Sequence, residues 1–241
     1  MLQAGGRLWL LGLEDEELRE VEVEVTTDLV ETRARWASGP RFLRNFDLSP
    51  SGARAVFEYR GDLFTVPVEE GSWRNITRSP GVADRYAVWS PKGDRIAWFS
   101  DEGGEYGLTV ADQDGGSPRR IEIADPTFFF VPTWSPDGQR LAYVLDVDGS
   151  EDFRIHVYDL VTGEHTNLTP GTPYALQPNF AWSPDGKQIA FLSDLAGRFD
   201  TYVMPASGGK ARLVLSTPHP DWEGAWSPCG RWLAVVAEAK G

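Results

Sequence analysis

The chain repeats one short phrase, and this repetition restricts its fold more than any other feature. WSPDGKQIAFLSD at 182–194 recurs as WSPDGQRLAYVLD at 134–146, as WSPKGDRIAWFSD at 89–101 and as WSPCGRWLAVVAE at 226–238; a weaker copy, LSPSGARAVFEYR, occupies 48–60. Along the chain, the serines of the Ser-Pro pairs are 41, 45, 48 and 44 residues apart. Short β segments at a period of about 40–50 residues are typical of a β-propeller, in which each repeat forms one four-stranded sheet.

Each copy divides into the same strands. A run ending in Trp-Ser is the expected inner strand, and Pro-Asp-Gly makes a tight turn because proline presets φ and glycine accepts a positive φ. The apolar run after the turn is the second strand, and two more strands follow across polar turns. We therefore predict an all-β fold, a five-bladed β-propeller of four-stranded antiparallel blades. The expected blades are 41–77, 85–123, 128–169 and 177–215, with 221–237 as the inner strands of a closing blade.

The two ends of the chain supply complementary parts of one blade. Residues 1–25 contain two strand-like runs, RLWLLGL and REVEVEV, before the first Ser-Pro pair, whereas the last copy stops after its second strand. We expect residues 1–25 to form the outer strands of the closing blade, so that 1–241 is a single domain without an open sheet edge. The alternative is an excerpt of a larger propeller, whose end strands would pair with another copy.

Composition excludes several classes of function. The net charge of −13 argues against binding to nucleic acid or to an anionic membrane surface, because both need a basic patch. The one cysteine, Cys229, excludes an intrachain disulfide, and no apolar run is long enough for a membrane helix. The first residues lack the basic region of a signal peptide, which favours the cytoplasm over the periplasm.

The copies resemble the WD40-like PD40 repeat found in TolB and in tricorn-type (S41) proteases. The resemblance covers the whole chain, and a narrower one to tricorn-like propellers lies in 41–110, in RGDLFTVP, RNIT and FSDEGGEY. It implies a propeller and, for tricorn, an involvement in oligopeptide breakdown. In that family the catalytic residues lie in a separate domain after the propellers. No position here matches that catalytic motif, so the expectation is a non-catalytic protein without a cofactor.

Large side chains gather in the loops that precede the inner strands. Three consecutive phenylalanines begin one such strand at 128–130, and neighbours on a strand alternate faces, so at least one is expected at the surface. Aromatic side chains around a propeller mouth suit a peptide or protein partner. The predicted ligand-binding residues are Trp36, Arg35, Tyr86, Phe128, Phe129, Tyr174 and Trp222. The alternative is that these side chains fill the channel or pack within the loops.

Two other readings stay open. A hydrolase at the channel mouth, resembling a glycosidase, would need two converging carboxylates. The candidates are Asp47, Asp84, Asp221 and Glu223. A TolB-like interaction scaffold would need none. The acidic run DVDGSED at 146–152 lacks the twelve-residue frame of a calcium loop, so we predict no metal site.

Overall fold

The computed structural model describes residues 2–4, 7–23, 40–123, 128–146, 149, 151, 153–171 and 175–237. Apart from one short 3₁₀ helix at Pro40–Phe42, every regular element in these residues is a β-strand, which confirms the all-β class. The chain divides into two compact units, Met1–Gly39 and Pro40–Gly241. In the described part of the chain, no helix has the length and apolar character needed to cross a membrane.

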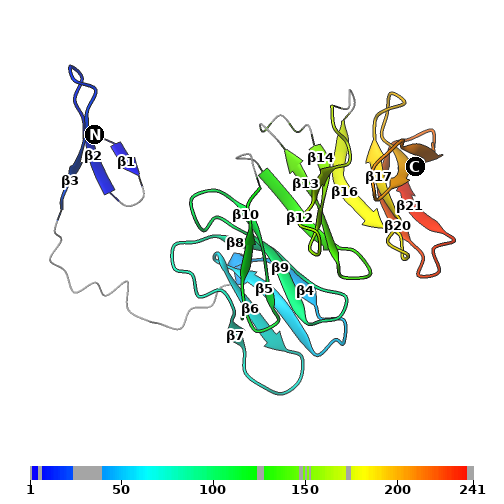
Figure 1. Ribbon diagram of the computed structural model, residues 1–241, viewed down its shortest axis with the longest axis horizontal. Helices are drawn as coiled ribbons and strands as arrows, with labels where there is room; N and C mark the ends of the chain where they lie inside the picture. The colour runs from blue at the N-terminus through cyan, green and yellow to red at the C-terminus, as the bar shows by residue number, and fades with distance from the viewer. Residues whose placement is uncertain are drawn as a thin grey trace. The chain divides into compact units, whose positions relative to one another are not determined.

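Four antiparallel sheets of four strands follow one another along the larger unit, and we call them blades 1 to 4 (Figure 1). Blade 1 consists of β4 (Leu43–Leu48), β5 (Arg54–Tyr59), β6 (Asp62–Pro67) and β7 (Arg74–Asn75). Blade 2 consists of β8 (Asp84–Trp89), β9 (Arg95–Ser100), β10 (Gly107–Asp112) and β11 (Arg119–Ile121). Blade 3 consists of β12 (Phe128–Trp134), β13 (Arg140–Asp146), β14 (Phe153–Asp159) and β15 (His165–Asn167). Blade 4 consists of β16 (Leu176–Trp182), β17 (Gln188–Ser193), β18 (Asp200–Pro205) and β19 (Arg212–Leu215).

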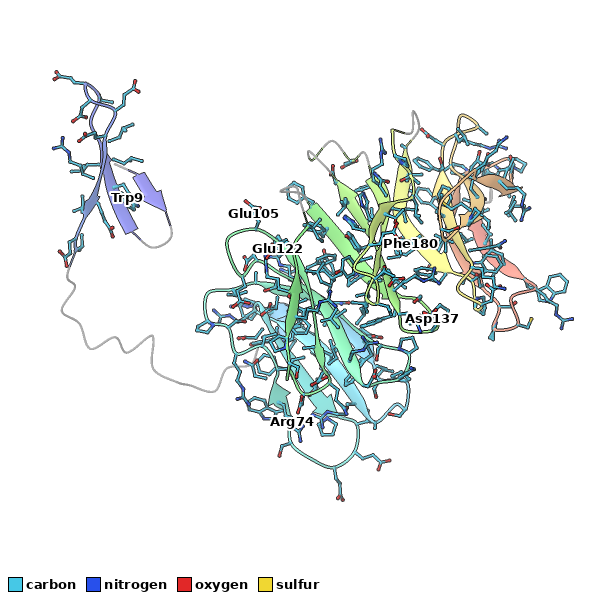
Figure 2. The ribbon with its side chains drawn as sticks, viewed as in Figure 1. Trp9, Arg74, Glu105, Glu122, Asp137 and Phe180 are labelled. Carbon is cyan, nitrogen blue, oxygen red and sulfur yellow. The ribbon has the colours of Figure 1, made fainter. Side chains whose placement is uncertain are left out.

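Two further sheets are smaller. β20 (Asp221–Trp226) and β21 (Leu233–Ala237) pair with each other, and we call this two-stranded sheet blade 5. In the N-terminal unit, β1 (Leu2–Ala4), β2 (Arg7–Leu11) and β3 (Leu18–Val21) form a three-stranded sheet with β2 in the middle. β2 lies within the RLWLLGL run and β3 overlaps the start of the REVEVEV run, while β1 is an additional strand. Trp9, labelled in Figure 2, lies on β2.

The repeated serine closes each Ser-Pro turn. Its hydroxyl accepts a hydrogen bond from the backbone N–H five residues later, at 2.9–3.1 Å in all five copies. In the two Pro-Asp-Gly copies, the serine hydroxyl also donates to Asp137 or Asp185 at 2.6 Å; Asp137 is labelled in Figure 2. These five serines have a structural role, which accounts for their repetition without catalysis.

Successive blades pack turn against turn. In blades 2 to 5 the turn glycine has a φ near +70° and faces the proline of the preceding blade's turn, with 3.4–3.8 Å between the proline Cδ and the place a Cβ would occupy. The pairs are Gly93–Pro50, Gly138–Pro91, Gly186–Pro136 and Gly230–Pro184. A side chain at these glycines would be strained by the positive φ, while a Cβ there would make ordinary contact with the neighbouring proline.

In blades 3 to 5 the repeated tryptophan joins the blade to the one before it. The indole N–H groups of Trp134, Trp182 and Trp226 donate to backbone carbonyls of the preceding blade at 3.2, 3.2 and 3.3 Å. Trp89, Trp134 and Trp182 are buried, whereas Trp226 in blade 5 is only half-buried. Three hydrophobic clusters fill the spaces between blades 1 and 2, 2 and 3, and 3 and 4.

Candidate aromatic binding site

An aromatic pocket of about 120 Å³ lies between blades 2 and 3, near the starts of β8 and β12. Its volume is comparable with the roughly 150 Å³ cavity that holds a benzene-sized ligand in another protein. The residues that line it are Arg85, Tyr86, Phe99, Tyr106, Phe128 and Phe129. Three of the seven residues predicted from the sequence, Tyr86, Phe128 and Phe129, therefore meet at one site.

The two phenylalanines of this site lie on opposite faces of β12. Phe128 is 65% exposed, whereas Phe129 is 8% exposed and stacks on Phe99 with 4.7 Å between ring centroids. This is the alternation that a strand imposes on neighbouring side chains. Phe129 therefore belongs to the core between the blades, and replacing it with alanine is expected to cost stability. Phe128 is the residue free to contact a ligand.

Tyr86 adopts a backbone conformation that is uncommon for a large side chain. Its φ is +57°, and it is the only aromatic residue with a positive φ in the described residues. It sits where the pairing of β8 with β9 shifts register, and its N–H donates to Glu58 Oε2 at 3.2 Å. Holding a residue in this region costs about 1–3 kcal/mol, and such strain clusters at binding and catalytic sites.

Arg85 supplies a cation at the mouth of the pocket. Its side chain is exposed, and its guanidinium carbon is 5.8 Å from the centroid of the Tyr106 ring. No ion pair within the described residues involves Arg85. Burial raises the pKa of the Tyr106 phenol, so this side chain stays neutral and acts as a face for the cation and as a hydrogen-bond donor.

Three residues that line the pocket were not predicted from the sequence. Phe99 belongs to the repeated second strand, and Arg85 lies directly opposite it in the β8–β9 pairing. Tyr106 lies in the loop between the second and third strands of blade 2, at the same end of the blade as the loop before β8. The loop between strands two and three lies at the same end of a blade as the loop before the inner strand. Considering both loops together would have predicted Tyr106 from its position in the repeat.

Of the other four predicted ligand-binding residues, the structure describes only Trp222. Trp222 lies on β20 with 54% of its side chain exposed, and it does not line the cavity. Trp36, Arg35 and Tyr174 lie outside the described residues.

The carboxylates considered for hydrolysis bind groups of the fold. Asp84 is buried and accepts hydrogen bonds from Trp98 Nε1 at 3.0 Å and Ser79 Oγ at 2.6 Å. Asp221 is also buried and accepts from Thr201 Oγ1 at 2.6 Å and Thr217 Oγ1 at 3.3 Å. These contacts give the two carboxylates a role in holding the starts of β8 and β20.

The two remaining acidic candidates differ from each other. Asp47 accepts the backbone N–H of Trp89 at 2.7 Å, which links blade 1 to blade 2, while burial raises the pKa of its carboxyl. Glu223 is exposed on β20.

Of the acidic run at 146–152, the structure describes Asp146, Gly149 and Glu151. Asp146 accepts the backbone N–H groups of Gly149 and Glu151 at 3.0 and 3.2 Å. Within the described residues, no group of three His, Cys, Asp or Glu side chains could hold a metal ion.

A chain of rings leads from the pocket toward the outer edge of blade 3. Phe99 and Phe129 contact Tyr143, which is fully buried. The Tyr143 hydroxyl lies 2.7 Å from His165 Nε2, and His156 Nδ1 lies 3.0 Å from the same nitrogen. Burial, the neighbouring His165 and the charge of Arg154 lower the pKa of His156 to about 4.

This shift predicts a loss of stability in acid. Since the folded state lowers the pKa of His156 from about 6.5, its stabilising effect is complete above pH 6.5 and is lost as the pH falls toward 4. Because the unfolded chain binds a proton at His156 more readily than the folded protein does, we expect the unfolding free energy to fall by about 3 kcal/mol over this range. Urea unfolding at pH 7 and pH 4 should therefore show a smaller difference for His156→Phe than for the parent protein. An equal difference in the two proteins would contradict the expectation.

Comparison with known families supports the repeat assignment. Residues 123–241 match the PD40 family, described as the TolB beta propeller domain. The fold is that of a TolB-like propeller. The resemblance to PD40 propellers that the Ser-Pro repeats indicated is thereby confirmed.

Solved structures of the same fold include TolB proteins and peptidases. A TolB protein from Agrobacterium tumefaciens superimposes with a TM-score of 0.65 at 24% identity, over 81% of this chain and 70% of that one. The tricorn protease superimposes with a TM-score of 0.67 at 18% identity, over 95% of this chain but 22% of the protease. A puromycin-hydrolyzing peptidase from Mycobacterium tuberculosis gives 0.62 at 18% identity, over 76% of this chain and 32% of that one. At these identities the likeness establishes the fold alone.

Proposed function

We propose that this TolB-like propeller is a non-catalytic binding protein that holds a peptide or a segment of a partner protein at the aromatic pocket. The observation that carries the proposal is Tyr86, a large aromatic residue kept at positive φ beside an open apolar cavity. A protein with only a structural need at this position would avoid the cost by using glycine.

The chemistry of the pocket indicates the type of segment that would bind. The exposed ring of Phe128 and the cavity beneath it suit one apolar or aromatic side chain. The guanidinium of Arg85 suits an adjacent carboxylate, which it can bind through two hydrogen bonds. We therefore expect a preference for an apolar residue next to an acidic group. With a net charge of −13, the rest of the protein would repel highly acidic peptides.

A peptide-binding experiment tests this proposal. Fluorescent oligopeptides should raise their anisotropy when mixed with the protein, and Phe128→Ala should weaken the best binder at least about fivefold. Phe46→Ala is the matched control, because Phe46 is 64% exposed, as Phe128 is, but lies in blade 1. Tyr86→Gly should also weaken binding, because it removes one of the rings that line the pocket.

The same mixtures distinguish the alternatives. Peptide cleavage that survives repurification and disappears in Glu223→Gln would replace the binding proposal with a hydrolase. Failure of every peptide to bind would favour a scaffold for a folded partner, as in the TolB-like reading.

We also propose that blade 5 is completed by β2 and β3, which would close a five-bladed ring. The turns at the two ends of the larger unit support this proposal. Gly52 in blade 1 has nothing within 4 Å of its Cβ position, whereas each turn glycine of blades 2 to 5 faces a proline of the preceding blade. Pro228 is the proline that closure would place against Gly52. Trp232 is 72% exposed and occupies the position that an arginine holds in other blades, and Leu48 is 54% exposed and occupies the position of the repeated tryptophan. Closure would bring these two side chains together.

Completing blade 5 requires one rearrangement. β21 would pair with the edge of β2 that β1 occupies, because β3 holds the other edge. β1 has three residues, so a longer strand can replace it at low cost. The proposed single domain then runs over residues 1–241, with 1–25 in the closing blade.

A further inference from the structure

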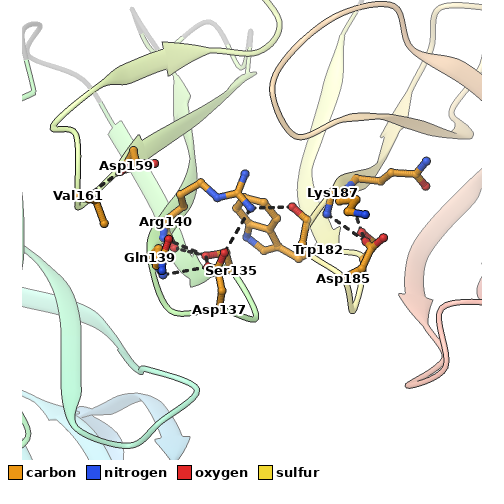
Figure 3. Close-up of polar contacts among 12 residues, drawn as sticks. Ser135, Asp137, Gln139, Arg140, Asp159, Val161, Trp182, Asp185 and Lys187 are labelled. Carbon is orange, nitrogen blue, oxygen red and sulfur yellow. Dashed lines mark hydrogen bonds and ion pairs between the residues drawn. The ribbon is translucent and has the colours of Figure 1, made fainter.

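Two of the junctions between blades are fastened by an arginine. Between blades 2 and 3, Arg95 donates to the carbonyl of Gly138 at 2.7 Å, and its guanidinium carbon lies 4.9 Å from the Trp134 ring. Between blades 3 and 4, Arg140 donates to the carbonyl of Gly186 at 2.8 Å and lies 4.9 Å from the Trp182 ring. Figure 3 shows Arg140 reaching across to Trp182. Each arginine follows its turn serine by five residues and binds the turn of the next blade.

The junction between blades 4 and 5 has the same parts but no arginine. Gln188 occupies the equivalent position, five residues after Ser183, and its side chain is exposed. Trp226 stands in the place of Trp182, and Gly230 in the place of Gly186. No arginine atom is among the nearest neighbours of the Gly230 Cβ position, whereas Arg140 lies 3.2 Å from that of Gly186.

A cavity of about 390 Å³ lies at this junction, with Gln188 in its lining. It is lined by the groups that hold the arginine elsewhere: the Trp226 ring, the Gly230 turn and the prolines of both turns, with Asp185 and Cys229 beside them. The cavity lies at the Ser-Pro turns, the opposite end of the inner strands from the aromatic pocket. It is thus a second site, separate from the one assigned above.

We propose that this cavity binds the guanidinium group of an arginine side chain supplied by a peptide or protein partner. The group would stack on Trp226 and donate to the carbonyl of Gly230, as Arg140 does at the preceding junction. The half-buried Trp226 would then become as covered as the three tryptophans before it.

The charges around the cavity favour a cation. A hydrogen bond from the Ser183 hydroxyl, with one from the Lys187 N–H, lowers the pKa of Asp185, which is therefore ionised at neutral pH. Asp137, its equivalent in blade 3, lies 3.8 Å from Arg140. The Ser227 hydroxyl and Arg231 lower the pKa of the Cys229 thiol to about 7, but the guanidinium of Arg231 beside it offsets the charge of the thiolate, so Asp185 is the main attraction for a cation. Lys187, labelled in Figure 3, opposes these charges from an exposed position on the turn.

The test uses N-acetyl-arginine amide as the probe and the indole N–H signal of Trp226 in an NMR spectrum as the readout. Trp226→Phe assigns that signal among those of the ten tryptophans. We expect a saturable shift with the arginine probe, and at least about fivefold weaker binding of N-acetyl-lysine amide, which lacks the planar fork.

Two matched variants make the test specific. Gln188→Arg should fill the cavity from within, abolish the Trp226 response and raise the melting temperature by about 2–4 °C. Arg140→Gln should create the equivalent opening one blade earlier, so that Trp182 also responds to the probe. The proposal would be overturned if Trp226 showed no saturable shift, or if the shift persisted unchanged in Gln188→Arg.

Discussion

Deleting residues 1–25 is expected to remove most of the folding free energy of this TolB-like propeller. If β2 and β3 complete blade 5, their loss leaves β21 with an unpaired edge and uncovers the apolar side chains at both ends of the ring. A domain of this kind has about 5–15 kcal/mol of stability, and the deletion removes two of the four strands of its closing blade. The truncated protein should therefore unfold at much lower urea than the parent, or form aggregates.

Deleting residues 1–5 alone is the control for this experiment. It removes β1 and frees the edge of β2, so the closing-blade arrangement predicts a melting temperature equal to that of the parent or higher. If both truncated proteins melted like the parent, the closing role of residues 1–25 would be wrong, and the ends of the larger unit would have to pair with other sheets.

The second large effect is expected from Trp182→Ala, which should lower the unfolding free energy by about 3–5 kcal/mol. Trp182 is 8% exposed, and its indole donates to Thr133 O of blade 3 at 3.2 Å. The substitution also removes the ring beneath Arg140 and leaves a cavity in the cluster between blades 3 and 4.

Trp73→Ala provides the comparison for that measurement. Trp73 is 59% exposed, and its one ring contact is with Phe64 at 5.7 Å, so we expect a loss of no more than about 1 kcal/mol. Urea denaturation of the two variants at pH 7 would decide. Equal losses would mean that the repeated tryptophan does not hold neighbouring blades together.

Local chemistry explains why the repeats were readable without coordinates. The Ser-Pro turn is specified within six residues, because Ser183 binds the N–H of Gln188 and Gly186 supplies the positive φ. Because each blade uses this turn, the same residues recur at the same spacing. The tryptophan at the end of the inner strand recurs with the same period. The aromatic candidates Tyr86 and Phe128 were also predictable, since both lie near the starts of inner strands, β8 and β12.

The sequence by itself therefore determined the all-β class, the four-stranded sheets, the PD40 assignment and the end of the blades where aromatic side chains gather. Only the tertiary structure decided that Phe129 is buried while Phe128 is exposed, and that Tyr86 is held at positive φ over a cavity shared with Tyr106. It also decided that a cavity with Gln188 in its lining lies at the junction after the one that Arg140 spans. The reason is that turns and strands depend on neighbours in the chain, whereas a pocket between blades depends on side chains some 40 residues apart, whose contacts are fixed only when the sheets pack.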